Sequence, residues 1–504
     1  MSKLVIAEKN SAAQSLSRVI GATKRQNGYL EGNGYLVSWC VGHLVELSAP
    51  ERYDEHFAKW RLEDLPILPE RFLYEASAGT RKQYQILKGL MERPDVTSLV
   101  CATDAGREGE LIFRLVYNQA RCKKPFERLW ISSMEDAAIR EGFEKLKPGT
   151  AYDLLYEAAL CRERADWIVG MNATRLFSCL YGQTLAVGRV MTPTLAMVVM
   201  RDAQIAAFKP EPFWTVQITV GGIQPRLPSL APAEQFTLTA SSRRFQQKEE
   251  AKDLAARCLK EGKAMIRTVE TKEKLEKPPL LYDLTSLQRD ANRILGFTAQ
   301  QTMDYTQSLY EKKLVTYPRT DSRYLTDDMR EMLPALVGSV AGKFNYAGAE
   351  LRTDPVHPAS VFDSSKVSDH HAIIPTKTMA GSDITGLSSG EKAVLQLISA
   401  RLLCAASEDH RYAEMTVKLS SGGEEFTRKG KTVLVPGWKA IWQHFYPEKK
   451  KDEEAAGPVP AEGTLVQVDA VEVKEGKTSP PKHFTEVICS LRGKWTVPKE
   501  RSSA

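Results

Sequence analysis

The sequence of 504 residues lacks any apolar run near the ~20 residues that a membrane-spanning helix requires. Its first strand-like stretch meets Glu8 and Lys9 too soon for a secretory signal peptide. No two of its eight cysteines stand at the C-x-x-C spacing of a zinc ribbon, and their scatter indicates no disulfide framework. These absences exclude the membrane-protein and disulfide-rich classes, and we expect a cytoplasmic protein.

An excess of charge of one sign is also lacking. The chain has 69 lysines and arginines against 63 acidic residues, a net charge of +6. This balance is compatible with a nucleic-acid partner but does not identify one. The length predicts about three domains, and the 42% hydrophobic content is enough for sizeable cores.

Carboxylates follow two buried strands that the sequence predicts. Residues 4–7 and 98–103 are continuous apolar runs, as expected of parallel strands covered on both faces. Glu8 follows the first run, and Asp104 and Glu108 follow the second. Ligands of open α/β sheets bind beyond the carboxyl ends of strands, and oxygen ligands of this kind suit Mg²⁺. For any single carboxylate, a polar loop that caps a strand is the simpler interpretation.

A tyrosine stands at the end of a third strand-like run, residues 314–317. Pro318 ends the run because it lacks the N–H that would continue a ladder. The hydroxyl of Tyr317 is a poor nucleophile at a pKa of about 10, but a cation and a polarised phosphate can activate it. The guanidinium of Arg319 matches phosphate oxygens. On these residues alone, a strand tyrosine beside a surface arginine remains the simpler interpretation.

The segment Thr-Tyr-Pro-Arg-Thr-Asp-Ser at 316–322 resembles the active-site signature of the type IA DNA topoisomerases, most closely the bacterial topoisomerase III branch. Two more motifs follow in the order of that family. Residues 187–195 are similar to G-R-V-Q-T-P-T-L, with Met191 in place of the glutamine. Residues 368–376 resemble its histidine motif, in which His370 holds the matching position.

The strand-end carboxylates resemble the Toprim domain of the same family. Its pattern is a Glu after the first strand and D-x-D-x-E after a later one, here Glu8 and residues 104–108, with Gly106 at the middle Asp. The missing carboxylate favours a single Mg²⁺ held by Glu8 and Asp104, with Glu108 nearby. Glu110 would compensate only if the turn brought it round.

The resemblance implies a multidomain α/β and α+β fold: an N-terminal Toprim domain with a parallel sheet, joined to helical and β-rich domains in a toroid. In the family, a later stretch completes the groove-forming domain, and from the divergence after residue 486 we expect a truncated or altered member. The implied domains are 1–151 for Toprim, 152–211 for the helical single-strand groove, 212–276 with 411–486 for the β-rich arch, 277–410 for the helical domain with the tyrosine, and 487–504 for a divergent tail.

The resemblance also implies the function and its residues. The reaction is ATP-independent relaxation or decatenation of DNA, through a 5′-phosphotyrosine, strand passage and religation. We expect a Mg²⁺-dependent monomer that acts on single-stranded segments of underwound or catenated DNA, at the bacterial nucleoid or on plasmids. The implied catalytic residues are Tyr317, Arg319, Glu8, Lys9 and His370; the metal ligands are Glu8, Asp104 and Glu108; the DNA contacts are Trp60, Arg162, Asp166, Trp167, Arg175, Val187, Gly188, Arg189, Val190, Met191, Thr192 and Arg319.

Other interpretations stay open. Arg162 and Asp166 have the i, i+4 spacing of a solvated ion pair on a helix. Trp60 could equally anchor a surface loop. An acidic Toprim site alone also fits a nuclease or a primase, which act without a nucleophilic tyrosine. A truncated toroid could instead bind single strands with little turnover.

Overall fold

The computed structural model describes residues 1–224, 234–347, 361–367, 370–447 and 459–484. The expected tail at 487–504 therefore lies outside the described residues, as do Ser368 and Asp369 of the histidine motif. None of the described helices combines the length and apolar character needed to cross a bilayer.

The N-terminal domain is built on a seven-stranded sheet in the order β2-β3-β4-β1-β7-β8-β9. The four central strands run parallel and the strands at the edges run antiparallel. The strands are β1 (Ser2–Ala7), β2 (Lys24–Gln26), β3 (Tyr29–Gly32), β4 (Tyr35–Trp39), β7 (Val96–Ala102), β8 (Phe126–Arg128) and β9 (Lys147–Pro148), and β5 (Val45–Leu47) pairs separately with β6 (Tyr74–Ala76).

Helices cover both faces of this sheet because both faces are apolar. Val5 and Ala7 of β1 pack with α1 and α4, whereas Leu4 and Ile6 pack with α2 and α3. The two apolar runs that predicted buried strands are confirmed as β1 and β7, paired in register with Leu4 opposite Leu99. The helices are α1 (Asn10–Ile20), α2 (Arg81–Glu92), α3 (Arg107–Gln119) and α4 (Asp136–Glu144).

The carboxyl end of β7 is held by one buried cation, Arg128. Its Nη1 donates to the carbonyl oxygens of Cys101 and Thr103 at 3.1 and 2.8 Å, and its Nη2 donates to that of Asp104 at 2.7 Å. Its Nε lies 2.9 Å from a carboxylate oxygen of Glu110, which is equally buried. This clamp fixes the turn that carries Asp104.

Two long helices follow in the chain, α5 (Asp153–Tyr181) and α6 (Met191–Ala206), as expected for residues 152–211; α5 packs on the N-terminal domain through Ala159 and Leu160. No residue of α6 is buried. Leu195, Val199 and Met200 are 60%, 57% and 65% exposed, so within the described part of the chain this apolar side of α6 is left open to solvent. Apolar surface of this kind usually contacts another polypeptide segment.

The β-rich domain is a closed barrel in the order β10-β11-β14-β13-β12-β15. Helix α7 (Lys248–Glu261) packs on it through Ala251, Leu254 and Cys258; the expectation of β-rich structure throughout 212–276 missed this helix. The strands are β10 (Pro212–Gln224), β11 (Glu234–Ser241), β12 (Lys263–Glu276), β13 (His410–Ser421), β14 (Glu424–Val435) and β15 (Leu465–Lys477).

The helical domain surrounds α12, whose side chains are mostly buried. Helices α8, α9 and α12 each begin with a capping box, in which the N-cap and N3 side chains satisfy each other's backbone N–H groups. The helices are α8 (Leu284–Leu295), α9 (Ala299–Glu311), α10 (Leu333–Lys343), α11 (Lys377–Gly381), α12 (Ser389–Ala405) and α13 (Trp438–Phe445).

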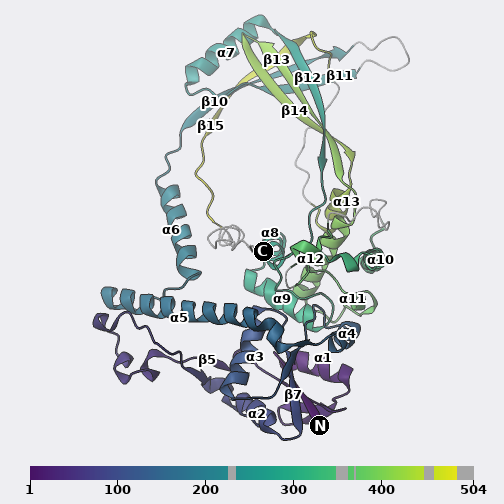
Figure 1. Ribbon diagram of the computed structural model, residues 1–504. Coiled ribbons are helices and arrows are strands. Elements are labelled where there is room, and N and C mark those ends of the chain that lie inside the picture. The colour runs from purple at the N-terminus through teal and green to yellow at the C-terminus, as the bar shows by residue number, and fades with distance from the viewer. Residues whose placement is uncertain (225–233, 348–360, 368–369, 448–458, 485–504) are drawn as a thin grey trace.

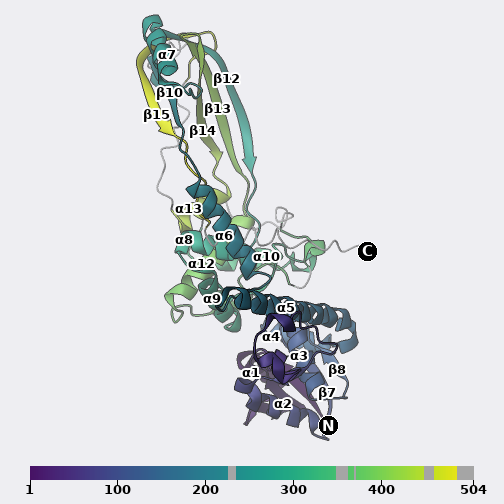
Figure 2. The ribbon, with the colours of Figure 1, turned by 90° about the vertical axis from the view of Figure 1, so that its left-hand side faces the viewer.

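The domains form a ring (Figure 1). From the N-terminal domain the chain runs along α5, which lies across that domain, rises through α6 to the barrel, and from β12 descends into the helical domain. The helical domain then lies directly against the N-terminal domain, as Figure 2 also shows from the side. The chain does not run directly between these two domains, so only non-covalent contacts close the ring at this junction.

We expect Arg128→Met to lower the free energy of unfolding of the N-terminal domain by about 3–5 kcal/mol, because it removes one of the two arginines that pair with the buried Glu110 carboxylate. Urea unfolding followed by hydrogen exchange in β7 measures this change. Lys3→Met removes an exposed ion pair with Glu127 and serves as the control, with a loss below about 1 kcal/mol. Equal losses for both variants would contradict the clamp.

Candidate active site

Two carboxylates meet at the carboxyl edge of the sheet. Glu8 follows β1 and is 5% exposed, and one of its oxygens accepts a hydrogen bond from the backbone N–H of Asp104 at 3.2 Å. Helix α3 can approach Asp104 this closely because residue 109 is glycine: a Cβ there would lie 2.0 Å from the Asp104 carbonyl oxygen. The sheet thus places two acidic side chains from different strands side by side.

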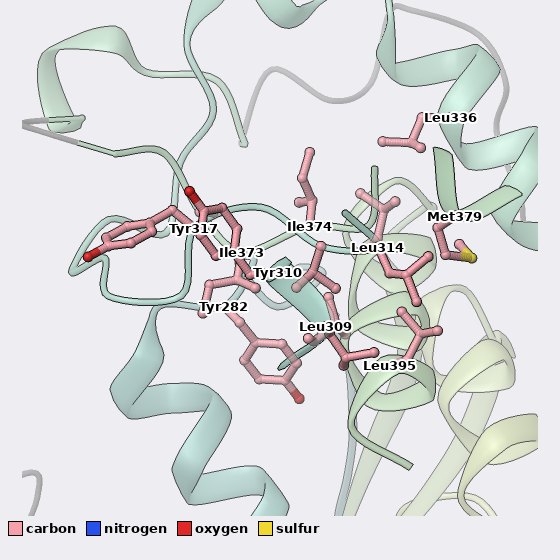
Figure 3. Packing of buried hydrophobic residues seen from close by; sticks show 14 of the residues in the cluster. Tyr282, Leu309, Tyr310, Leu314, Tyr317, Leu336, Ile373, Ile374, Met379 and Leu395 are labelled. Carbon is pink, nitrogen blue, oxygen red and sulfur yellow. The ribbon is translucent and has the colours of Figure 1, made fainter. Parts of the chain in front are cut away.

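Tyr317 reaches this pair from the helical domain. Its segment is extended and joined to the segment after His370 by a bridge between Val315 and Pro375. Tyr317 belongs to the same buried apolar cluster as Leu314 and Ile374, and Figure 3 shows its ring at the margin of that cluster, pointing away from both. Its hydroxyl donates to Asp104 Oδ2 at 3.1 Å. The structure therefore brings the expected nucleophile to the expected acidic edge, across a domain junction.

Two cations border the same place. Nη1 of Arg319 lies 3.8 Å from Glu8 Oε1 and 3.7 Å from Asp104 Oδ2. Nζ of Lys9 lies 3.7 Å from Glu311, a residue of the helical domain. Both cations are only partly buried, so an incoming phosphate could reach them.

His370 packs directly on the tyrosine, with ring centroids 4.3 Å apart. Its Nε2 lies against the carbonyl oxygen of Ala105 and its Nδ1 lies 3.0 Å from Ser132 Oγ. A carbonyl oxygen only accepts, so Nε2 carries the proton and Nδ1 accepts from the serine hydroxyl. Burial lowers the pKa of His370 to about 4, so the ring is neutral and its nitrogens are both used within the protein.

Burial also tunes the acid and the tyrosine. Burial, and then the charge of Asp104, raise the pKa of Glu8 to about 7, although Arg319 opposes the shift. The same two causes raise the pKa of Tyr317 above its ordinary value, again against Arg319. Near neutral pH the tyrosine is therefore protonated, while Glu8 exchanges its proton readily.

The third expected metal ligand is already paired with a histidine. Glu108 pairs with His43 at 2.6 Å, and this hydrogen bond lowers the pKa of the carboxyl and raises that of the imidazole. Glu110 is buried between Arg114 and Arg128, so the turn does not bring it round to replace a ligand at Gly106. No cluster of three potential metal-ligating side chains occurs among the residues that the structure describes.

The remaining pair still fits Mg²⁺. Protein sites commonly hold this ion by one or two carboxylates together with water and phosphate oxygens, and Glu8 and Asp104 offer two carboxylates. The space at Gly106 is open, since an added Cβ would have no neighbour within 4 Å. Glycine there removes a charge from the site without being required for packing.

Cations extend from this site onto α5. Arg162 is exposed, and after burial the charges of Arg107 and Arg189 are the main causes that lower its pKa. Arg189 pairs with Asp166 at 2.6 Å. The loop that carries Arg189 is fixed at both ends, because Val187 bonds to Thr174 and the N–H of Gly188 donates to Thr192 Oγ1 at 3.1 Å; Val190 and Met191 are exposed beside it.

Three residues expected to touch DNA hold a loop against α5. Arg175 is buried, and its Nη1 donates to the carbonyl oxygen of Phe57 at 2.7 Å. Trp167 packs between Tyr53 and Phe72, and Trp60 lies under the Arg175 guanidinium. Of these three, Trp60 alone is widely exposed, at 43%, so its ring is the most open to a bound strand, and DNA contact by Trp60, Trp167 and Arg175 stays a prediction.

Comparison with known proteins agrees with this geometry. A profile described as DNA topoisomerase matches residues 150–488, and one described as Toprim domain matches residues 3–134. The chain belongs to the DNA topoisomerase family. The full-length topoisomerase I of Thermotoga maritima shares the fold, with a TM-score of 0.70 over 98% of this chain and 75% of that one at 22% identity. The fold is that of a type IA topoisomerase toroid.

Curated relatives are closer in sequence. Proteins named DNA topoisomerase 3 from Bacillus subtilis and Bacillus licheniformis are each 41% identical to this chain. The matches cover 96% of this chain and 66% of each relative. The chain therefore spans slightly less than two thirds of the length of these topoisomerases.

Several residues of this topoisomerase site were missed in the sequence. His43 follows β4, which lies beside β1 in the sheet, so a third strand end at the same edge was a usable signal. Arg107 stands between two recognised acidic positions. Ser132 and Ala105, which hold His370, carry no signal because their contribution depends on the domain junction.

We expect the raised pKa of Glu8 to appear in stability. Its ordinary pKa of 4.5 becomes about 7 in the folded chain, so the stability that the bound proton provides is complete below pH 4.5 and is lost as the pH rises to 7. Glu8→Gln removes this dependence. The unfolding free energy of the variant relative to the native protein should rise by about 2–3 kcal/mol over this interval and stay constant above it. Urea unfolding at several pH values measures it, and a flat difference would contradict the assignment.

Proposed function

We propose that this chain transiently breaks and rejoins one strand of DNA through Tyr317. The observation that carries the proposal is the 3.1 Å hydrogen bond from the Tyr317 hydroxyl to Asp104, because it joins a hydroxyl of one domain to the acidic strand ends of another. The names of the Bacillus relatives support the same activity. Since the match spans 66% of their length, turnover by these 504 residues is part of the proposal.

The reaction is a reversible transesterification. The Tyr317 hydroxyl releases its proton to solvent as its oxygen bonds to phosphorus and the bond to the 3′ oxygen breaks. The 3′ oxygen takes up a proton, so the tyrosine becomes linked to the 5′-phosphate and the 3′ end is retained as a hydroxyl. One phosphodiester replaces another, so no ATP is needed. A second strand passes while the ring is open, and the 3′-hydroxyl then reverses the exchange.

The neighbours of Tyr317 take separate roles. Asp104 orients the hydroxyl by accepting its hydrogen bond. Arg319 and Lys9 stabilise negative charge on the phosphate. The Arg319 guanidinium faces two carboxylates, and a bound phosphate would become its partner in their place. With a pKa of about 7, Glu8 can give a proton to the leaving 3′ oxygen and take it back on religation. His370 fixes the tyrosine ring, and contact between its imidazole and the phosphate stays a prediction.

Glu8 and Asp104 are the residues that would hold Mg²⁺, with Glu108 joining them only if it leaves His43. The bound ion would supply positive charge beside the DNA phosphates and the 3′ end. The exposed cations of α5, Arg162 and Arg189, with Trp60, suit a single strand through phosphate contact and base stacking. We further propose a monomer that acts on single-stranded segments of underwound or catenated DNA in the bacterial cytoplasm, at the nucleoid or on plasmids.

Two other functions predict different products. A nuclease or primase of the Toprim type would act without a protein–DNA bond. A binding toroid would hold single strands and fail in relaxation, and the open apolar side of α6 is the observation that favours testing it. Plasmid relaxation with Mg²⁺, run beside adduct detection, separates these functions.

We expect Tyr317→Phe to bind a labelled single-stranded oligonucleotide as the native protein does but to form no covalent adduct, because the attacking oxygen is gone. Denaturation followed by gel electrophoresis detects the adduct. Tyr310→Phe is the matched control, because the ring centroids of Tyr310 and Tyr317 lie 5.4 Å apart. This variant should still form the adduct. Adduct trapped by Tyr317→Phe would refute the assignment.

We expect Asp104→Asn to slow relaxation about tenfold or more while adduct formation persists, because the amide oxygen still accepts from Tyr317 but the charge for Mg²⁺ is lost. Gly106→Asp adds a carboxylate at an open position and should lower the Mg²⁺ concentration for half-maximal relaxation. A Mg²⁺ titration of both variants measures this. Titration profiles identical to that of the native protein would show that these residues do not hold the metal.

A further inference from the structure

The junction that closes the ring has a polar patch separate from the active site. Glu135 and Asp136, at the start of α4, face the helical domain there. Asp136 pairs with Lys313 at a short distance, and Glu135 Oε1 accepts from the N–H of Thr378 at 3.1 Å and from its hydroxyl at 2.7 Å. None of these four residues contacts Tyr317, Glu8 or Asp104 in any of the interactions described above.

The partners of this patch belong to the unit that carries the tyrosine. Thr376 donates through its N–H to the carbonyl oxygen of Leu314 at 3.0 Å, and its hydroxyl bonds to that of Lys313. The N–H of Thr316 donates to Ile374 at 2.9 Å. Lys313 and Thr378 therefore stand at one end of a paired extended unit, and Tyr317 stands at the other.

The tyrosine end of this unit also bonds to the N-terminal domain. The N–H of Tyr317 donates to the carbonyl oxygen of Ser132 at 3.3 Å. Between Ser132 and Glu135, a cleft of about 570 Å³ opens between the domains, lined on one side by Trp130 and Ser133 and on the other by Met332 and Lys377. Side chains do not fill this part of the junction by close packing. The polar contacts at its edges therefore contribute more to holding the two domains together.

We propose that Glu135 and Asp136 are positioning residues that latch the tyrosine unit onto the N-terminal domain, through Thr378 and Lys313. While the latch is closed, Tyr317 stays in register with the acidic strand ends. The latch must release before the two domains separate. Its role in the reaction depends on the function proposed above, whereas its effect on separation does not.

Backbone hydrogen exchange without DNA tests the latch. The amides of Tyr317 and Thr378 bond across the junction, so they exchange when the domains separate, whereas those of Thr316 and Thr376 bond within the helical domain. We expect Asp136→Asn and Lys313→Met each to speed exchange at Tyr317 and Thr378 by about three- to tenfold, as for loss of one half-exposed charged hydrogen bond. Combining the two substitutions should increase the exchange rate little beyond either one alone, because both remove the same contact.

The matched control is Arg18→Met. Arg18 is the other partner of Asp136 at 3.2 Å, is largely exposed, and lies in the same domain as Asp136, so its loss should leave exchange at the junction unchanged. Unchanged exchange in Asp136→Asn, or an equal rise in Arg18→Met, would overturn the latch. A rise at Thr316 and Thr376 as well would show local unfolding instead of separation and would also overturn it.

A second measurement carries the latch into the reaction. With a single-stranded oligonucleotide, Asp136→Asn should raise the steady-state level of covalent adduct about threefold, because separated domains religate more slowly, with the initial rate of cleavage unchanged. If the native protein forms no adduct, the proposed function fails while the exchange result still decides the latch. Adduct at the native level in a variant with faster exchange would limit the latch to the resting protein and overturn its role in religation.

Discussion

The structure depends on one non-covalent junction, where the helical domain lies on the N-terminal domain. Chain connectivity joins these domains only the long way round, through α5, α6 and the barrel. At the junction a tyrosine from one side donates to a carboxylate from the other. The contact that assembles the chemical site is therefore also the contact that closes the ring, and neither domain contains the site alone.

Charge balance explains why the site can persist without substrate. Burial imposes a desolvation cost on the Glu8 carboxylate, and the neighbouring Asp104 carboxylate repels its charge, so the pKa of Glu8 rises to about 7. Arg319 partly offsets the repulsion from 3.7–3.8 Å, too far for a hydrogen bond. A bound phosphate would replace the carboxylates as the partner of this guanidinium, and a bound cation would reduce the repulsion between the carboxylates. The resting site therefore suits a phosphate and a cation, as the proposed reaction requires.

The sequence predicted the parts of the site that depend on local pattern. The apolar runs before Glu8 and Asp104 made β1 and β7 predictable, and Pro318 made the end of the tyrosine segment predictable. Helix α7 was missed although Ala251, Leu254 and Cys258 recur at helical spacing, because alternation in the flanking strands dominated the interpretation.

The side chains that the sequence could not assign are those whose partners come from afar. Whether Glu110 faces the site or Arg128 depends on the turn of α3, and whether Arg175 faces DNA or Phe57 depends on a loop more than a hundred residues earlier. Motif resemblance fixes residue types but not the direction of a side chain, so Glu108 was assigned to a metal while its nearest partner is His43.

The composition of the junction suits a contact that, in the proposed reaction, must break repeatedly. Separating a buried apolar interface costs roughly 25 cal/mol for each Å² of apolar surface that becomes exposed. Breaking a polar contact exchanges its partner for water at a net cost of about 0.5–1.5 kcal/mol. Apolar residues of both domains join one cluster at Met134 and Tyr310, but the neighbouring cleft and the contacts of Glu135 and Asp136 interrupt it. More apolar packing would hold Tyr317 more firmly and would also make separation slower, so a partly polar junction reconciles alignment of the nucleophile with opening of the ring.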